Sequence, residues 1–376
     1  MNVHQFKITN AKDCDTIESG DYDWVMCYGA KIILENEIIT SNILEKFQNA
    51  KLFFCSTAGE ICKLGVCDNS IIITAIKFNR TIVKAHNIKI KDFNSSFEAG
   101  QFLAKQLDEE NLKHIFIISD GSLVNGSELV NGLNEFYQSK VIITGGLAGD
   151  DTNFDYTITG LNEHPSRGNI IGFGLYGDHI LITHSSMGGW DSFGLSKTVT
   201  HAVGNELFEI NGRNALDFYT EQLGKYSEGL PGTALLFPLA VKLNDSDESV
   251  VRTILSINNE KKSMIFAGDI PEGSKVKFMM ANFDRLIDAA GNAAKKSITQ
   301  SPNFTPELAI LISCVGRRIV LAGRTDEEIE AVQNELGPNV PIAGFYSYGE
   351  ISPLNEGVGC QLHNQTMTIT CFQEIE

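Results

Sequence analysis

Short apolar runs that stop in polar, glycine-containing loops recur along the chain. The clearest lies at residues 340–353, and the same layout occurs at residues 52–61 and 141–151. Each run predicts a buried strand that ends in a loop, and loops at strand ends carry much of the chemistry of binding. All three loops close on a glycine followed by an acid: Gly59-Glu60, Gly149-Asp150 and Gly349-Glu350.

Three copies of strand, loop and Gly-acid predict an internally related architecture. Residues 115–119 and 310–314 extend the likeness, since each is followed by a glycine-containing loop, a helix and then a strand with its Gly-acid loop. The spacing is too irregular for a solenoid, so a duplicated domain fits better. The alternative is that Gly-acid after a strand is ordinary turn chemistry.

Strand and helix patterns alternate in the first half of the chain. A capping box opens a helix after Ser95 that continues to Leu107, and residues 113–119, 127–137 and 141–144 predict strand, helix and strand. This alternation is typical of α/β proteins. A second capping box, Thr325 to Glu328, opens a later helix.

Other segments are β-rich. Residues 70–78 and 81–90, divided by Asn79-Arg80, predict a hairpin. Successive β-rich runs between residues 169 and 210 predict an antiparallel meander. The fold class expected is α/β to α+β, with two domains of mixed sheets covered by helices. The expected domains are a lead-in at 1–21, a first domain at 22–212 and a second at 213–376.

These motifs also carry a family resemblance. In the first half the matching pieces are Cys55-Ser-Thr-Ala-Gly-Glu-Ile61 and Thr144-Gly-Gly-Leu-Ala-Gly-Asp150. In the second half they are Cys314-Val-Gly-Arg317, residues 344–353 and Leu362-His-Asn-Gln-Thr366. The chain resembles FIST proteins, in which a FIST N-terminal domain precedes a FIST C-terminal domain.

The resemblance implies a cytoplasmic sensory module for signal transduction that binds small molecules, with amino acids among the proposed ligands. Some members resemble haem-based nitric oxide sensors. Members are often fused to signalling output domains, and the two expected domains leave no such segment in this chain. We therefore expect the signal to pass to a separate protein partner.

The charge and composition of the chain disfavour several classes of function. The formal charge of −17 over 376 residues disfavours binding to nucleic acid or to anionic membrane surfaces. The first ten residues contain no apolar core of signal-peptide length, and no apolar run is long enough to span a bilayer. The eight cysteines include no Cys-x-x-Cys pair, which favours reduced thiols. A cytoplasmic protein is expected.

The segments that come near to catalytic or cofactor motifs each lack a required feature. Gly172 to Gly177 has dinucleotide-binding spacing but lies within β-rich sequence, and Ser127 stands where a P-loop needs lysine. No Gly-x-Ser-x-Gly elbow is present, so we do not expect an enzyme. The histidines are scattered, which predicts no metal site and no cofactor. Haem remains an alternative, through His184, His201 or His363.

The remaining chemistry suits a small polar ligand. Arg317 offers a planar fork for a carboxylate and Glu350 could hold an ammonium, so an amino-acid-like molecule is compatible. The alternative is that Arg317 and Glu350 pair with each other. A second alternative is a protein interaction module without a ligand. The candidate ligand-binding residues are Arg317, Tyr346, Ser347, Tyr348, Gly349, Glu350, Gly149, Asp150, Gly59, Glu60 and Cys314.

Overall fold

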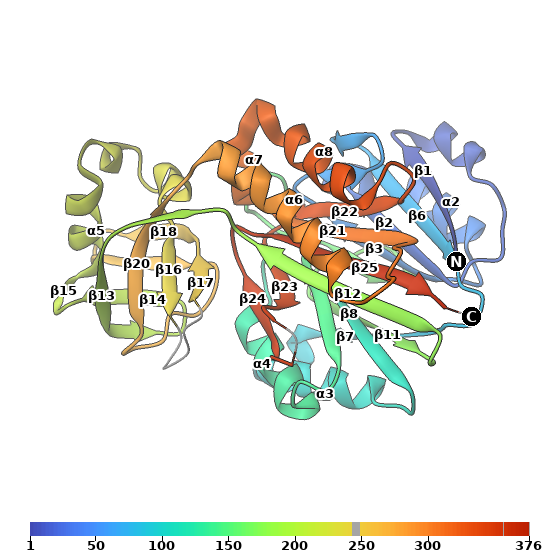
Figure 1. Ribbon diagram of the computed structural model, residues 1–376, viewed down its shortest axis with the longest axis horizontal. Coiled ribbons are helices and arrows are strands. Elements are labelled where there is room, and N and C mark those ends of the chain that lie inside the picture. Colours follow the sequence, from blue (N-terminus) through green and yellow to red (C-terminus); the bar gives the residue numbers. More distant parts are fainter. Residues whose placement is uncertain (243–248, 356, 376) are drawn as a thin grey trace.

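The computed structural model describes residues 1–242, 249–355 and 357–375. Within them the chain forms eight α-helices and four β-sheets. Figure 1 shows a large body that holds three sheets and both chain ends, and a small body at the left built around the fourth sheet. The small body comprises the described residues between 191 and 282. The mixed α/β class predicted from the sequence is confirmed.

Three sheets build the large body. The five-stranded sheet has the order β1 (Asn2–Ile8), β6 (Ile71–Lys77), β2 (Trp24–Gly29), β3 (Lys51–Ser56) and β10 (Thr159–Leu161). One six-stranded sheet has the order β24 (Cys360–His363), β23 (Gly349–Pro353), β9 (Ile142–Leu147), β8 (Leu112–Ser119), β11 (Asn169–Tyr176) and β7 (Ile82–Lys89). The other has the order β12 (Ile180–Met187), β25 (Met367–Glu374), β21 (Leu308–Cys314), β22 (Ile342–Ser347), β4 (Glu60–Cys62) and β5 (Gly65–Cys67).

The three sheets face one shared core. Trp24 lies 5.4 Å from both Phe116 and Phe173 and 6.3 Å from Phe372, measured between ring centroids. Apolar residues from all three sheets complete the cluster. Burying such large rings together stabilises this body.

Helices cover the outer faces of the sheets. They are α1 (Lys31–Leu34) and α2 (Glu37–Lys46) on the first sheet, α3 (Ser96–Leu107) and α4 (Gly126–Tyr137) on the second, and α6 (Phe283–Thr299), α7 (Val315–Leu321) and α8 (Thr325–Leu336) on the third. Ser95 caps α3 by accepting a hydrogen bond from the Glu98 amide, as its sequence predicted. Short 3-10 helices occupy Ala11–Thr16, Ile90–Asp92, Gly224–Gly229, Gly232–Leu236 and Ala322–Arg324.

The small body leaves the large one after β12 and rejoins it at α6. Its sheet has the order β17 (Ser249–Arg252), β16 (Leu239–Lys242), β20 (Lys275–Met280), β13 (Asp191–Val203), β14 (Glu206–Ile210), β19 (Ser263–Phe266) and β18 (Ile254–Asn258), with β15 (Arg213–Asn214) beside β14. The helix α5 (Ala215–Leu223) packs on its core. The boundary predicted at 212/213 falls in the turn between β14 and β15, and the domain limits remain a prediction.

The hairpin predicted around Asn79-Arg80 is wrong. β6 pairs with β1 and β2, whereas β7 pairs with β11 in a different sheet. The Glu374 carboxylate accepts hydrogen bonds from the amides of Asn79 (2.8 Å), Arg80 (3.0 Å) and Thr81 (2.9 Å). A distant acid therefore fixes this turn so that the chain crosses between sheets.

The meander predicted between residues 169 and 210 is also wrong for its first strands. β11 pairs with β7 and β8, β12 pairs with β25, and only β13 and β14 pair with each other. Consecutive strands were assumed to be neighbours, but here the chain distributes them over three sheets. The internal relation among the Gly-acid segments remains a prediction, although each follows the second strand of a parallel pair: β2–β3, β8–β9 and β21–β22.

Candidate functional site

The three Gly-acid loops meet in the large body. The Gly149 amide donates to the Ser56 carbonyl at 2.9 Å, and the Ala58 amide donates to the Tyr346 carbonyl at 2.8 Å. β23, which begins at Gly349, pairs with β9. The loops therefore contact one another directly.

Two of the glycines are required by the conformation and packing of these loops. A Cβ on Gly149 would lie 2.8 Å from the backbone nitrogen of Ala58. Gly59 has a φ of +123°, which side chains rarely adopt. Gly149 allows two loops to approach each other and Gly59 allows a turn, and both roles are structural.

Glu60 and Glu350 occupy equivalent, buried positions. Each accepts hydrogen bonds from a hydroxyl three residues earlier and from a second hydroxyl of a neighbouring segment; the donors are Thr57 and Ser70 for Glu60, and Ser347 and Thr366 for Glu350. Burial raises the pKa of Glu60 to about 7 and that of Glu350 to about 8, although the hydrogen bonds act in the opposite direction. Asp150 is paired instead with Lys31, at 2.7 Å between Nζ and Oδ2.

The structure does not place Arg317 as an anion anchor in a pocket. Its side chain is fully buried, and Nε and Nη2 donate to Glu328 at 3.1 and 2.8 Å. Nη1 and Nη2 also donate to the carbonyls of Gly188 (2.5 Å) and Leu286 (2.7 Å). The predicted alternative, pairing with Glu350, is wrong as well, because the partner is Glu328.

The capping box predicted from Thr325 to Glu328 is wrong. No side chain caps α8, and the Glu328 carboxylate is buried between Arg317 and the hydroxyl of Tyr346, which donates to it at 2.6 Å. Tyr346 therefore points into this buried cluster. A carboxylate in the first turn of a helix has the same sequence signature whether it caps the helix or pairs across the core.

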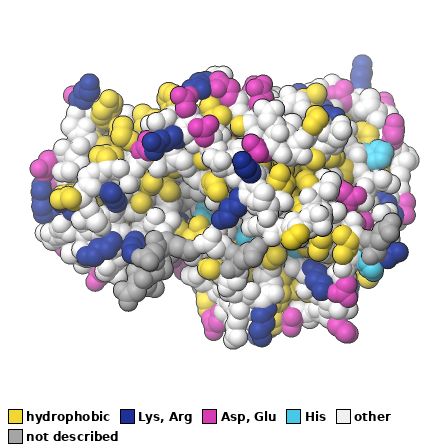
Figure 2. Space-filling view, in the orientation of Figure 1, with side chains coloured by type: hydrophobic (Ala, Val, Ile, Leu, Met, Phe, Trp, Pro, Cys, Tyr) yellow, Lys and Arg dark blue, Asp and Glu magenta, His cyan; other side chains and the backbone are white. Residues whose placement is uncertain are grey.

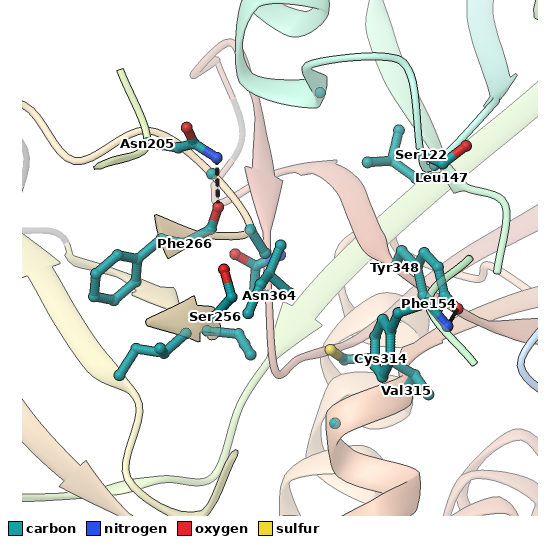
Figure 3. A pocket seen from close by; sticks show the side chains of 18 of the residues that line it. Ser122, Leu147, Phe154, Asn205, Ser256, Phe266, Cys314, Val315, Tyr348 and Asn364 are labelled. Carbon is teal, nitrogen blue, oxygen red and sulfur yellow. Dashed lines mark hydrogen bonds between the residues drawn. The ribbon is translucent and has the colours of Figure 1, made fainter. Parts of the chain in front are cut away.

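A cavity of about 640 Å³ lies between the two bodies. Figure 3 shows Asn205, Ser256 and Phe266 of the small body on one side, and Phe154, Cys314, Val315 and Tyr348 of the large body on the other, with Asn364 between them. Cavities of this size at a junction between bodies are typical small-molecule sites.

Two of the predicted site residues line this cavity, Cys314 and Tyr348. The other nine are not among its lining residues: Arg317, Tyr346, Ser347, Gly349, Glu350, Gly149, Asp150, Gly59 and Glu60. Burial raises the pKa of the Cys314 thiol well above its usual range, so this cysteine is not a thiolate. The sequence therefore pointed to two residues of the lining.

An aromatic pair forms part of the lining. The rings of Phe154 and Tyr348 stack with centroids 4.9 Å apart and an interplanar angle of 18°. The Tyr348 hydroxyl donates to the carbonyl of Asp151 (3.3 Å) and accepts from the amide of Phe154 (3.1 Å). Tyr348 is therefore held in place while its ring remains at the cavity.

The sequence reasoning missed most of the lining. Thr253, Ser256 and Phe266 come from β-rich sequence of the small body, and nothing in that pattern distinguishes them from ordinary strand residues. Asn364 is different, because it lies in the segment Leu362–Thr366 that helped to carry the family resemblance. That segment was the sequence signal that could have identified Asn364 as a residue of the site.

The cavity carries little charge. Among the described residues that line it, Asp155 is the only one with a formal charge, and it is exposed. The lining therefore suits a neutral or weakly cationic molecule better than an anion. On the outer face shown in Figure 2, basic side chains are interspersed with acidic ones.

The histidines do not fit haem in this cavity. No histidine is found among its described lining residues. His201 is exposed and lies 3.1 Å from Glu272, whereas His184 and His363 are buried, and burial lowers the pKa of each to about 4. Elsewhere in the described chain, no group of three or more His, Cys, Asp or Glu residues is placed to hold a metal ion.

Helices that could cross a bilayer are also missing from the part of the chain that the structure describes, since none is both long and apolar enough.

Comparison with known proteins identifies two family models. The FIST N domain matches residues 23–213 and the FIST C domain matches residues 215–353. The chain is also similar to an uncharacterized protein of Methanocaldococcus jannaschii, with 23% identity over 292 residues that cover 72% of this chain and 55% of that protein. The chain thus spans about half the length of this curated relative.

Proposed function

Because this chain belongs to the FIST family of sensory and signalling domains, we propose that it is a sensory protein that binds a small molecule between its two bodies and signals to a separate protein. The observation that carries the proposal is the cavity of about 640 Å³, whose wall combines both bodies. Its lining is mainly apolar with a few polar groups, which is the usual composition of a ligand site.

The junction offers a physical route for a signal. Direct hydrogen bonds across it include Arg252 Nη1 to the Leu362 carbonyl (2.9 Å) and Asn125 Nδ2 to Asp269 Oδ1 (3.2 Å). A ligand that contacts both walls adds its own interactions to these. Its binding free energy then favours one relative position of the bodies over others, and a partner protein can recognise that position.

The ligand class proposed is a small polar molecule. An amino acid is one candidate, since Asp155 could meet its ammonium group, but its carboxylate would find only neutral donors in the lining because Arg317 is engaged by Glu328. We propose binding rather than turnover, because the Glu60 and Glu350 carboxyls are enclosed by their own hydroxyl partners and do not line the cavity. A reducing compartment, as expected for the cytoplasm, agrees with the eight free cysteines.

A thermal-shift screen against a metabolite panel that includes amino acids and haem tests the proposal. A true ligand should raise Tm by an amount that grows with its concentration over Kd. Ser256→Phe should abolish the shift because the new ring enters the cavity, whereas Ser196→Phe, at an exposed position of β13, should preserve it. The proposal fails if no compound shifts Tm, or if Ser256→Phe leaves every shift intact.

The partner is sought separately. The full chain, with and without the ligand found in the screen, is used to capture proteins from an extract. A sensory role predicts a protein whose capture changes with the ligand, and capture that ignores the ligand contradicts that part of the proposal.

A further inference from the structure

The turn between β24 and β25 brings an unsatisfied carboxamide to the cavity. Asn364 is 1% exposed and lines the cavity. Neither its side-chain oxygen nor its nitrogen has a hydrogen-bond partner among the described residues. A buried amide without partners costs free energy, so this position calls for an explanation.

Neighbouring groups share this condition. Thr253, from the opposite wall, is 4% exposed and its hydroxyl is also unpartnered among the described residues. The Gln365 carboxamide is unpartnered too, and it packs against Gly316, where a Cβ would lie 2.4 Å from Nε2. Five of the thirteen unsatisfied buried side-chain atoms in the described chain belong to these three residues. The unsatisfied groups are therefore concentrated here.

The turn itself is firmly held. The indole N–H of Trp190 donates to the Gln365 carbonyl at 2.8 Å, and the Cys314 amide donates to the Thr366 carbonyl at 3.1 Å. The Thr366 amide donates to Glu350 at 3.2 Å. Since the backbone is anchored on both sides, the free carboxamide of Asn364 is a feature of an ordered turn.

We propose that the cavity recognises a neutral, planar ligand in which an N–H donor stands directly beside a C=O acceptor, and that Asn364 forms a pair of hydrogen bonds with that edge. Lactams, cyclic dipeptides and uracil-type rings have this cis-amide edge. This inference rests on the proposed function and narrows its ligand class.

The geometry of the groups supports this class. A carboxamide presents one acceptor and one donor side by side, which complements a cis-amide edge in the way that Asn pairs with a base edge in DNA. An open-chain trans amide points its N–H and C=O in opposite directions and cannot make both bonds. The apolar lining, with the Phe154–Tyr348 ring pair, suits the rest of a planar ring.

The absence of a cation argues for neutrality. No lysine or arginine is found among the described lining residues, so a carboxylate or phosphate would be buried without a counter-charge. The Thr253 hydroxyl, which can donate or accept, could satisfy a further polar atom of the ring.

The test uses two matched pairs of probes on the purified chain. Uracil is compared with 1,3-dimethyluracil, and glycine anhydride with sarcosine anhydride, each at about 10 mM. We expect uracil or glycine anhydride to raise Tm by about 2 °C or more, and their N-methylated analogues to have no effect. Equal shifts within each pair would overturn the inference, and so would the absence of any shift with uracil and glycine anhydride.

Variants distinguish a binding residue from a structural one. Asn364→Leu should raise or preserve the Tm of the free protein, because it removes unsatisfied polar atoms, and should abolish the response to the probes. Asn364→Asp loses a donor and gains charge, so it should also abolish the response to the probes. Asn303→Asp, at an exposed position outside the cavity, is the control and should preserve the response. A lowered Tm for Asn364→Leu together with an unchanged response to the probes would overturn the inference.

The outcomes also separate this inference from the proposed function. If the cis-amide probes fail but another metabolite shifts Tm and Ser256→Phe abolishes that shift, the ligand class is wrong and the sensory site stands. If neither probes nor metabolites shift Tm, both are overturned.

Discussion

Replacing Arg317 with lysine separates a structural role from a ligand-binding role. Lysine keeps the positive charge but loses the planar fork that holds Glu328 through Nε and Nη2. If Arg317 bound a ligand carboxylate, its loss would appear in affinity. In the structure its side chain is buried and donates to Glu328 and to two backbone carbonyls, so we expect the loss in the free energy of unfolding.

The magnitude follows from the bonds that lysine cannot replace. Arg317 donates to Glu328 twice and to the carbonyls of Gly188 and Leu286. A lysine ammonium at this site could keep Glu328 and one carbonyl, so about two charge-assisted hydrogen bonds are lost, or roughly 3–6 kcal/mol. Arg317→Met should cost about as much, because it leaves a carboxylate buried without its charge partner. Adding Glu328→Gln to Arg317→Met should then recover about 1–3 kcal/mol.

Urea unfolding measures these changes as a shift of the midpoint at constant slope. Arg324→Lys is the matched control, since Arg324 pairs with Glu327 and Asp284 at the surface and should change stability little. Any ligand found by thermal shift should bind Arg317→Lys with unchanged Kd. The reasoning is refuted if Arg317→Lys retains wild-type stability and binds the ligand at least about tenfold more weakly.

Three further outcomes follow from buried groups. Burial raises the pKa of Glu350 from 4.5 to about 8, so its stabilising contribution is full below pH 4.5 and is lost as pH rises to about 8. Glu350→Gln should therefore flatten the fall of Tm between pH 4.5 and 8. The pKa of His114 is lowered to about 3 by burial, so stability should fall as pH drops below 6.5, and His114→Gln should lessen that fall in urea unfolding at pH 4–7. Gly149→Ala places a Cβ 2.8 Å from Ala58 N and should cost about 1–3 kcal/mol, whereas Gly323→Ala, with no atom within 4 Å, should be near neutral in the same assay.

Local signals in the sequence predicted local structure well. The cap at Ser95 and the end of its helix at Leu107 were both readable, because capping and apolar periodicity depend on residues close in the chain. The strands that precede Gly59, Gly149 and Gly349 were readable for the same reason.

Contacts between residues that are distant in the sequence could not be predicted in this way. The turn at Asn79-Arg80 has the composition of a hairpin, but Glu374, almost three hundred residues away, holds its amides and the two strands join different sheets. Arg317 and Glu328 are eleven residues apart, and each has a common local explanation, as a ligand anchor and as a helix cap. Only the packed structure shows that they neutralise each other in the core.

The location of the cavity explains why the predicted loops supply so little of it. Loops from three sheets must pack against one another, and their glycines and glutamates are used in that packing. Side chains at the edge of the packed loops, such as Tyr348 and Asn364, are the ones that face the small body. Since the opposite wall comes from the small body, a ligand there contacts both parts of the chain and adds to direct hydrogen bonds such as that from Arg252 Nη1 to the Leu362 carbonyl. Its binding free energy can therefore favour one relative position of the bodies, which is the property a sensor needs.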